Sequence, residues 1–268
     1  MTIVAFAGPS LAGADRRQFP GIEWRPPAEA GDLLRLRADP PAALCLIDGY
    51  FDHRPAVRHK EILLLMAEGV RIFGAASIGA LRAAEMHPFG MTGVGAIYRA
   101  YARDSIEGDD EVALIHAGAE RDWRPLSIPM VDVRAILCRA MRERVVAAAE
   151  ARALLLGASG FHYAERSWEG IFAAAAIPAA TLRGFRIWLG ACGFSQKNLD
   201  AIACINAAMD GSLTKPRRPR AVKTSFLHAL ARECGVALGR RDPKRVPGGR
   251  APIPAGSRER AADKGPSR

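Results

Sequence analysis

The sequence predicts an α/β protein: a parallel sheet with flanking helices in the N-terminal half, an all-helical C-terminal half and a disordered basic tail. Three observations support this. The first 90 residues alternate short apolar runs with helical patterns, residues from Pro129 onward show only helical patterns, and glycine, proline and arginine dominate beyond Gly239. With 268 residues, 49% hydrophobic and 25% charged, the composition is globular and excludes a coiled coil or a collagen-like fibre.

The predicted strands are apolar along their whole length and are separated by helices. This pattern is typical of a parallel sheet covered on both faces, because helical crossovers place helices there. Ligands of such sheets gather beyond the carboxyl ends of the strands, so the loops at Gly8–Ser10, Asp48–Phe51 and Ala75–Ser77 are the candidate site. The predicted strands are Thr2–Ala7, Ala43–Asp48 and Val70–Gly74, and the helices are Glu29–Ala38, Pro55–Glu68 and Ile78–Met86.

The second half of the chain is predicted to be helical, after a helix near Ala96–Arg103. We expect three regions: an α/β core at residues 1–128, a helical region at 129–238 and the tail at 239–268. The tail is too poor in apolar residues to offset the entropy of ordering it. The further helices are expected at Val131–Leu156, Ser167–Ala176, Ala179–Leu189, Gln196–Met209 and Ala221–Cys234.

The formal charge of +10 is concentrated at one end. Lys215–Arg268 holds 15 basic and 4 acidic residues, which leaves a nearly neutral body of 23 basic and 24 acidic residues. The five cysteines form no C-x-x-C pair, which indicates reduced thiols in a cytoplasmic protein. No apolar run approaches the ~20 residues of a membrane span, and no residue grouping predicts a metal or a cofactor.

Lys60 is the first anomaly that could carry chemistry. At about 100° per residue it falls within the apolar arc of its predicted helix, opposite Glu61 and Glu68. Burial disfavours the charged form of a lysine and can make the amine a base near neutral pH. Alternatively, Lys60 reaches water or pairs with a carboxylate such as Asp48.

Ser77 is the second anomaly, at the turn between an apolar strand and a helix. The small residues Ala75 and Gly79 flank it as in a nucleophile elbow, the sharp strand–turn–helix that exposes a serine hydroxyl. The amides of Ile78 and Gly79 could hold an oxyanion at the helix N-terminus. Alternatively, Ser77 is only a helix N-cap.

Together, Lys60 and Ser77 suggest a Ser–Lys pair in which a neutral lysine takes the serine proton. Their spacing permits contact without dictating it. A conventional triad with His59, His87 or His116 stays open, although no sequence context places any of them beside Ser77.

The chain also resembles the TfuA-like family, over about residues 1–135. The matching motifs are Asp48-Gly49-x-Phe51, Val57-x-His59-Lys60-Glu61-Ile62-Leu63, Gly74-Ala75-Ala76-Ser77-x-Gly79-Ala80-Leu81-Arg82-Ala83-Ala84-Glu85, Phe89-Gly90-Met91-x-Gly93-x-Gly95, Asp109-Asp110-Glu111-Val112-Ala113 and Pro125-Leu126-Ser127-x-x-Met130-Val131. The residue before His59 departs from the family pattern, because Arg58 stands where an aromatic residue is expected.

The resemblance implies a partner of a YcaO enzyme in peptide-backbone thioamidation. It implies hydrolysis of the C-terminal thiocarboxylate of a ThiS-type, ubiquitin-like sulfur carrier, with release of sulfide. Carried over to this chain, it makes Ser77 the nucleophile and Lys60 its base, without a cofactor or a metal. Asp48, His59, Arg82 and Glu85 lie in matching motifs as possible supporting residues.

Two other functions compete with this enzyme. The α/β half could be a non-catalytic adaptor that docks the YcaO protein and its peptide. Binding of nucleic acid by the basic segment Lys215–Arg268 ranks below both, because that segment has one aromatic residue, Phe226, and no recognisable nucleic-acid-binding motif.

Overall fold

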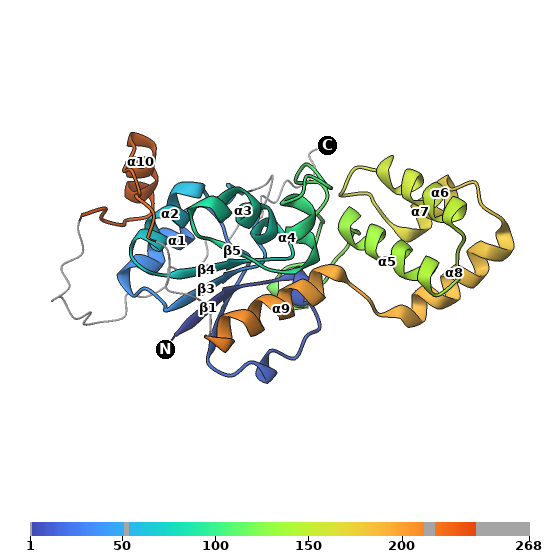
Figure 1. Cartoon of the computed structure of the whole chain (residues 1–268), viewed down its shortest axis with the longest axis horizontal. Coiled ribbons are helices and arrows are strands. Elements are labelled where there is room, and N and C mark those ends of the chain that lie inside the picture. The colour runs from blue at the N-terminus through green and yellow to red at the C-terminus, as the bar shows by residue number, and fades with distance from the viewer. Residues whose placement is uncertain (1, 51–53, 212–217, 240–268) are drawn as a thin grey trace, which may run out of the picture. The chain divides into compact units, whose positions relative to one another are not determined.

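The computed structural model describes residues 2–50, 54–211 and 218–239. Its centre is a five-stranded sheet of order β2-β1-β3-β4-β5, in which all neighbours pair in parallel (Figure 1). The sheet with its flanking helices confirms the predicted fold class. The strands are β1 (Ile3–Phe6), β2 (Ile22–Arg25), β3 (Ala43–Leu46), β4 (Arg71–Gly74) and β5 (Thr92–Gly93).

The two edge strands were not predicted. β2 has the sequence Ile-Glu-Trp-Arg and is only partly buried, so it lacks the continuous apolar run of a central strand. β5 has only two residues, one of them a glycine. Both strands exist because the central strands offer backbone groups for them to pair with, and their own propensity for strand is weak.

Helices of the N-terminal half cover one face of the sheet. α2 (His59–Ala67) and α3 (Ile78–Met86) pack with α1 (Asp32–Arg35) on Val4, Leu44 and Ile72. α3 has the predicted bounds, whereas α2 begins four residues later than expected. Glu61 of α2, expected opposite the apolar arc, is fully buried, and its carboxylate accepts hydrogen bonds from the Gly31 and Arg58 amides.

The opposite face of the sheet is covered by α9 (Gln196–Asp210). Ala201, Cys204, Ile205 and Ala208 of this helix pack with Ala5, Cys45 and Phe73 of the central strands. The α/β core therefore extends beyond the expected residues 1–128, and the described residues up to Leu238 form one compact unit. A helix more than 100 residues beyond the sheet completes its second layer (Figure 1).

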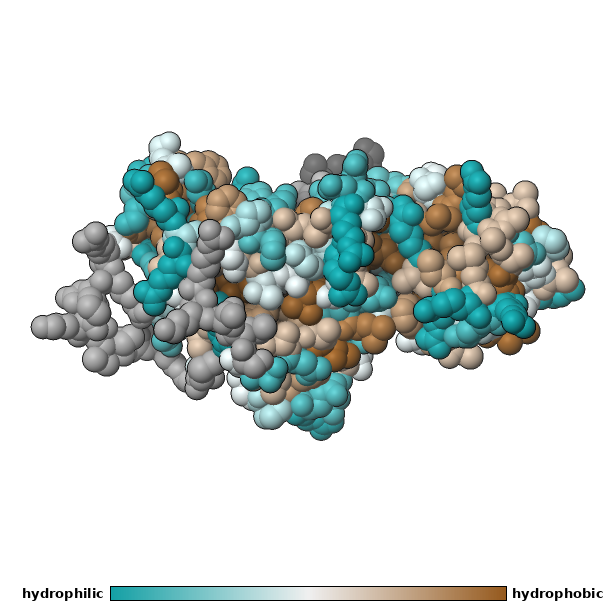
Figure 2. Space-filling view, in the orientation of Figure 1, coloured by the Kyte–Doolittle hydropathy of each residue, from teal (hydrophilic) through white to brown (hydrophobic). Residues whose placement is uncertain are grey.

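Four helices, α5 (Met130–Arg142), α6 (Ala148–Ser159), α7 (Trp168–Ala174) and α8 (Ala179–Cys192), form their own apolar core around Trp168, Phe172 and Phe185. The expected single helix at Val131–Leu156 is wrong: the chain breaks between α5 and α6, where Arg144 has a positive φ of 59°. Figure 2 shows apolar surface over this part of the molecule, where Leu156 and Ile187 are exposed. Two further helices pack elsewhere: α4 (Gly95–Tyr101) packs with Ala80 of α3, and α10 (Ser225–Glu233) packs with Leu34 of α1 and Leu64 of α2.

The expected disordered tail, apart from Gly239, lies outside the described residues, as does Phe51. Across the described ranges, no helix is long and apolar enough to cross a membrane.

Candidate functional site

Ser77 stands between β4 and α3, on a turn that small residues make possible. Ala76, directly before it, has a positive φ of 65°, a conformation that costs energy for a residue with a side chain. A Cβ on Gly79 would lie 1.8 Å from the Leu46 carbonyl oxygen, so this position accepts only glycine. The strained turn and the close approach of α3 to β3 are the features expected of a nucleophile elbow.

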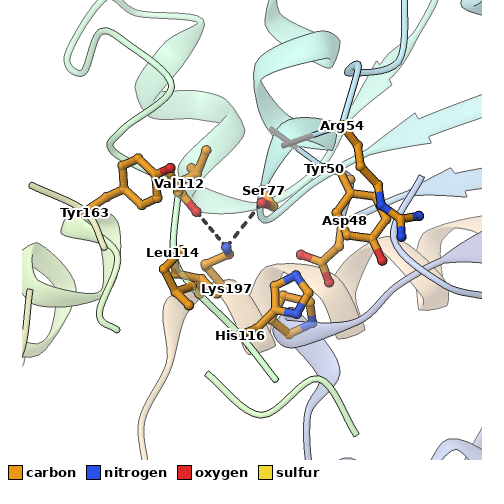
Figure 3. Close-up of a pocket in the computed structure, with 13 residues that line it drawn as sticks. Asp48, Tyr50, Arg54, Ser77, Val112, Leu114, His116, Tyr163 and Lys197 are labelled. Atoms are coloured by element: carbon orange, nitrogen blue, oxygen red, sulfur yellow. Dashed lines mark hydrogen bonds between the residues drawn. The ribbon is translucent and has the colours of Figure 1, made fainter. Parts of the chain in front are cut away.

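The Ser77 hydroxyl does not cap α3, although the residue occupies the N-cap position. Instead its Oγ accepts a hydrogen bond from Nζ of Lys197, at 3.2 Å (Figure 3). The same Nζ donates to the carbonyl oxygen of Val112, at 2.8 Å. The cap interpretation of Ser77 is therefore wrong for its side chain, which faces an amine.

Lys197 is the second residue of α9 and only 2% exposed. No carboxylate of the described residues forms an ion pair with it, since its two bonds go to a hydroxyl and a carbonyl. Burial lowers the pKa of this amine, and the more distant charges of Asp48 and Asp132 offset that shift only in part. A buried lysine with a lowered pKa can exist as a neutral base.

Asp132 of α5 fixes the start of α9. Its carboxylate, largely buried, accepts hydrogen bonds from the Ser195 hydroxyl and from the Gln196 and Lys197 amides, at 2.8–3.1 Å. Burial raises the pKa of Asp132, while these donors and Lys197 favour its charged form. This carboxylate sets the direction from which the Lys197 side chain reaches Ser77.

Asp48 is the supporting residue that the structure brings to the site. It follows β3 and is 1% exposed, and its carboxylate accepts bonds from the Gly8 amide and from the amide and hydroxyl of Ser10. These three donors hold a negative charge near Lys197 without direct contact. Asp48 thus ties the loops after β1 and β3 together at the carboxyl edge of the sheet.

A cavity of about 300 Å³ opens at Ser77 and Lys197. One side carries Tyr50 and Arg54, whose guanidinium lies 4.7 Å from the tyrosine ring centroid, while Tyr163 lies on the other (Figure 3). The ring of His116 lies 6.1 Å from that of Tyr50, and its Nδ1 bonds to the Ala117 carbonyl. The cavity therefore brings aromatic rings and a guanidinium around one hydroxyl and one amine, and Asp48 and residues 112–115 also line it.

Lys60 does not occupy the place expected for it. It is the second residue of α2, half-buried, and is not among the residues that line this cavity. Within the described part of the chain, the amine bonded to Ser77 is that of Lys197. The pairing of Ser77 with Lys60 is thus replaced, because the serine side chain meets α9 on the opposite face of the sheet from α2.

His59, Arg82 and Glu85 form a separate cluster. Glu85 accepts a bond from Arg82 at 2.7 Å and lies 2.7 Å from Nε2 of His59, and Arg82 also donates to the Val57 carbonyl. None of the three lines the cavity. They connect the start of α2 to α3, so their position supports packing of these helices and not contact with a ligand of Ser77. His116 lines the cavity, but the structure gives it no bond to Ser77.

One of the two predicted oxyanion donors is already used. The Gly79 amide donates to the Ile47 carbonyl oxygen at 3.3 Å, so the expectation for Gly79 is wrong. The Ile78 amide has no acceptor among the described residues. The Gly49 amide also lacks one, and Gly49 lines the cavity.

Sequence reasoning missed Lys197, although a signal was present. Lys197, Ala201, Cys204, Ile205 and Ala208 follow the spacing of one helix face, and four of them are small or apolar. Lys197 meets the same criterion as Lys60, because each is a lysine within the apolar face of a helix. Its partner, however, lies 120 residues away in the chain.

The site holds no grouping suited to a metal. In the part of the chain that the structure describes, no three or more His, Cys, Asp or Glu side chains gather as ligands. The five cysteines are free, and Cys45 and Cys204 face each other in the core between the sheet and α9.

The fold and the site define an α/β protein with a serine on an elbow-like turn beside a buried lysine. The family model of TfuA-like proteins matches residues 48–167, which confirms the resemblance seen in the sequence: the chain carries a TfuA-like domain. The matched segment includes Asp48 and Ser77 and ends before Lys197. Comparison with curated proteins gives no match. The family match supports a role in the YcaO-associated thioamidation system.

Proposed function

We propose that this protein hydrolyses the C-terminal thiocarboxylate of a ubiquitin-like, ThiS-type sulfur carrier and supplies the sulfide to a YcaO enzyme in the cytoplasm. The observation that carries the proposal is the buried amine of Lys197, 3.2 Å from the Ser77 hydroxyl and without a carboxylate partner among the described residues. A structural lysine would be expected to have an ion-pair partner at such depth. A general base needs to lose its proton, which this environment favours.

In the first half of the reaction, neutral Lys197 takes the proton of Ser77 and Oγ attacks the terminal carbonyl carbon. The carbon–sulfur bond breaks, and the sulfur leaves as hydrosulfide with the proton from Lys197. In the second half, Lys197 takes a proton from water, and the resulting hydroxide attacks the acyl-serine. Lys197 returns this proton to the Ser77 oxygen as the acyl–oxygen bond breaks, and the carrier leaves as a carboxylate after its carboxyl proton passes to solvent. No cofactor takes part.

We propose the amides of Ile78 and Gly49 as the donors to the developing oxyanion. The Ile78 amide follows the nucleophile directly, as in other elbows. The Asp48 carbonyl accepts a bond from the Ala28 amide, so the Gly49 N–H in the same trans peptide points away from Ala28. Each such donor contributes about 3 kcal/mol to stabilising a transition state in known hydrolases.

Sulfide release from a thiocarboxylated carrier protein tests the proposal. The wild-type chain should release sulfide, and Ser77→Ala should release none above the spontaneous rate. Ser105→Ala, which removes an exposed hydroxyl after the end of α4 and outside the cavity, is the matched control and should keep the wild-type rate. Circular dichroism confirms that each variant is folded. A folded Ser77→Ala protein with undiminished sulfide release would refute the nucleophile and leave the adaptor function.

A further inference from the structure

Residues 112–116 form one wall of the cavity and carry an unpaired backbone edge. On one side this segment forms a short antiparallel bridge with residues 124–127: Ala117 donates to the Arg124 carbonyl, and the Leu126 and Ser127 amides donate to Ile115. The Ile115 amide donates to the Ser127 hydroxyl. The N–H and C=O of Ile115 and the N–H of Ala117 thus point toward this bridge.

The groups on the other edge follow from trans peptide geometry, in which the C=O and N–H of one peptide point in opposite directions. Because the N–H and C=O of Ile115 and the N–H of Ala117 face the bridge, the Leu114 C=O and both groups of His116 face away from it. Among the described residues, none of these three groups has a hydrogen-bond partner. The segment therefore presents an acceptor, a donor and an acceptor in a row.

This edge faces the cavity of Ser77. The cavity is lined by every residue from Val112 to His116 and by none of residues 124–127. The Val112 carbonyl, two residues before Leu114, points to Nζ of Lys197 (Figure 3). The free edge thus begins at His116, near Tyr50 and Arg54, and ends at the Ser77–Lys197 pair.

We propose that this edge binds the extended C-terminal tail of the acyl donor as an added antiparallel strand, a substrate subsite that rests on the proposed function. The two bonds of Lys197 place Ser77 Oγ within about 6 Å of the Val112 carbonyl oxygen. A strand added to an edge lies about 4.8 Å away from it. A tail paired with Leu114 and His116 therefore runs into Ser77.

Only one direction of the tail fits. An antiparallel tail passes His116 first and Val112 last, so that its C-terminal carbon arrives at Ser77. A parallel tail would end near His116, about 13 Å along the segment at ~3.3 Å per residue. The subsite therefore takes at least four extended residues at a free C-terminus. Because the hydrogen bonds go to the backbone, it selects chain extension and not particular side chains.

The decisive experiment is a scan of single N-methylations along such a tail. The probe is a fluorescein-labelled octapeptide of alternating alanine and threonine with a C-terminal carboxylate, the form of the hydrolysis product. Its affinity for the full-length Ser77→Ala chain is measured by fluorescence anisotropy. In an antiparallel pair, alternate N–H groups point to the neighbouring strand. Single N-methylations should therefore alternate in effect along the tail. A methyl group on an N–H that points to the edge should weaken binding at least five-fold, and one on the N–H of either neighbouring residue should leave binding unchanged.

Two substitutions of His116 test the same edge by changing the protein in place of the peptide. His116→Pro removes the N–H and places the proline ring in the path of the tail, whereas His116→Ala removes the imidazole and keeps the N–H. That N–H has no partner within residues 2–50, 54–211 and 218–239, so its loss breaks no hydrogen bond among them. His116→Pro should bind the octapeptide at least ten-fold more weakly than His116→Ala.

The outcomes separate this subsite from the proposed function. Equal loss at all methylated positions, loss at none, absence of octapeptide binding, or equal affinities of the two His116 variants would each overturn the subsite. Failure of the wild-type chain to release sulfide from the thiocarboxylated carrier would instead overturn the proposed function, and the binding scan would still report on the edge.

Discussion

Helices α2 and α9 each carry a lysine as their second residue, and they pack on opposite faces of one sheet. Lys60 of α2 is half-buried and outside the cavity, whereas Lys197 of α9 is buried and bonded to Ser77. Their helical phase alone does not separate them. What separates them is the face toward which the elbow turns its serine, a property of the tertiary structure.

The two helices also differ in how their first turns are held. α2 is held by its own Glu61, which accepts from the Arg58 amide at the helix start. α9 is held by Asp132, which comes from α5 and accepts three bonds from residues 195–197. The start of α9 is therefore fixed relative to another helix, and this gives the Lys197 amine a defined position.

Replacement of each lysine by methionine should distinguish the roles of Lys60 and Lys197 most clearly. Lys197→Met removes the proposed base and should lower sulfide release at least 100-fold, the usual contribution of general base catalysis. Lys60→Met should stay within about two-fold of wild type. Both rates are measured on the thiocarboxylated carrier. Because methionine fills a similar volume without a buried charge, both variants should fold, which thermal unfolding verifies. The reverse ranking would restore Lys60 as the base.

Removal of the two carboxylates should show that the helix starts differ in function. Asp132→Ala leaves one buried and two part-buried donors without their acceptor and should lower the free energy of unfolding by about 3–5 kcal/mol, against about 2–3 kcal/mol for Glu61→Ala. Urea denaturation gives both values. Only Asp132→Ala should also lower sulfide release by the folded protein, because it releases Lys197. Equal rates in the two folded variants would argue that Asp132 is purely structural.

The buried Glu61 should make stability depend on pH. Burial raises its pKa to about 7, against the lowering effect of the Arg58 and Gly31 amides. Between the unfolded pKa of 4.5 and about 7, the native state binds more protons than the unfolded state, so stability falls as pH rises. This shift corresponds to up to about 3 kcal/mol.

Urea unfolding at pH 5 and pH 8 checks the effect of Glu61. The wild-type chain should lose stability between these values, and Glu61→Gln should lose less, because glutamine does not titrate. An identical difference in both proteins would mean that Glu61 is ionised in the native state throughout this range.

The central sheet and α3 could be predicted because their signals are local. Runs such as Ile3–Phe6 and Ala43–Leu46 are apolar throughout, and the small residues around Ser77 mark a tight turn. Ser77 and Asp48 could be placed at the site because the carboxyl ends of parallel strands meet at one edge. Lys197 could not be placed there, because no local sequence pattern indicates that α9 packs on the second face of the sheet.

His59→Ala should have the smallest effect and completes the comparison of the two faces. His59 is 2.7 Å from Glu85 in an exposed pair with side-chain exposures of 46% and 38%, and such pairs contribute about 0–1 kcal/mol. Its loss should therefore lower the free energy of unfolding by less than about 1 kcal/mol and leave sulfide release within two-fold. A large loss of activity with unchanged stability would mean that the α2 face contributes to the reaction, and that α9 does not act alone.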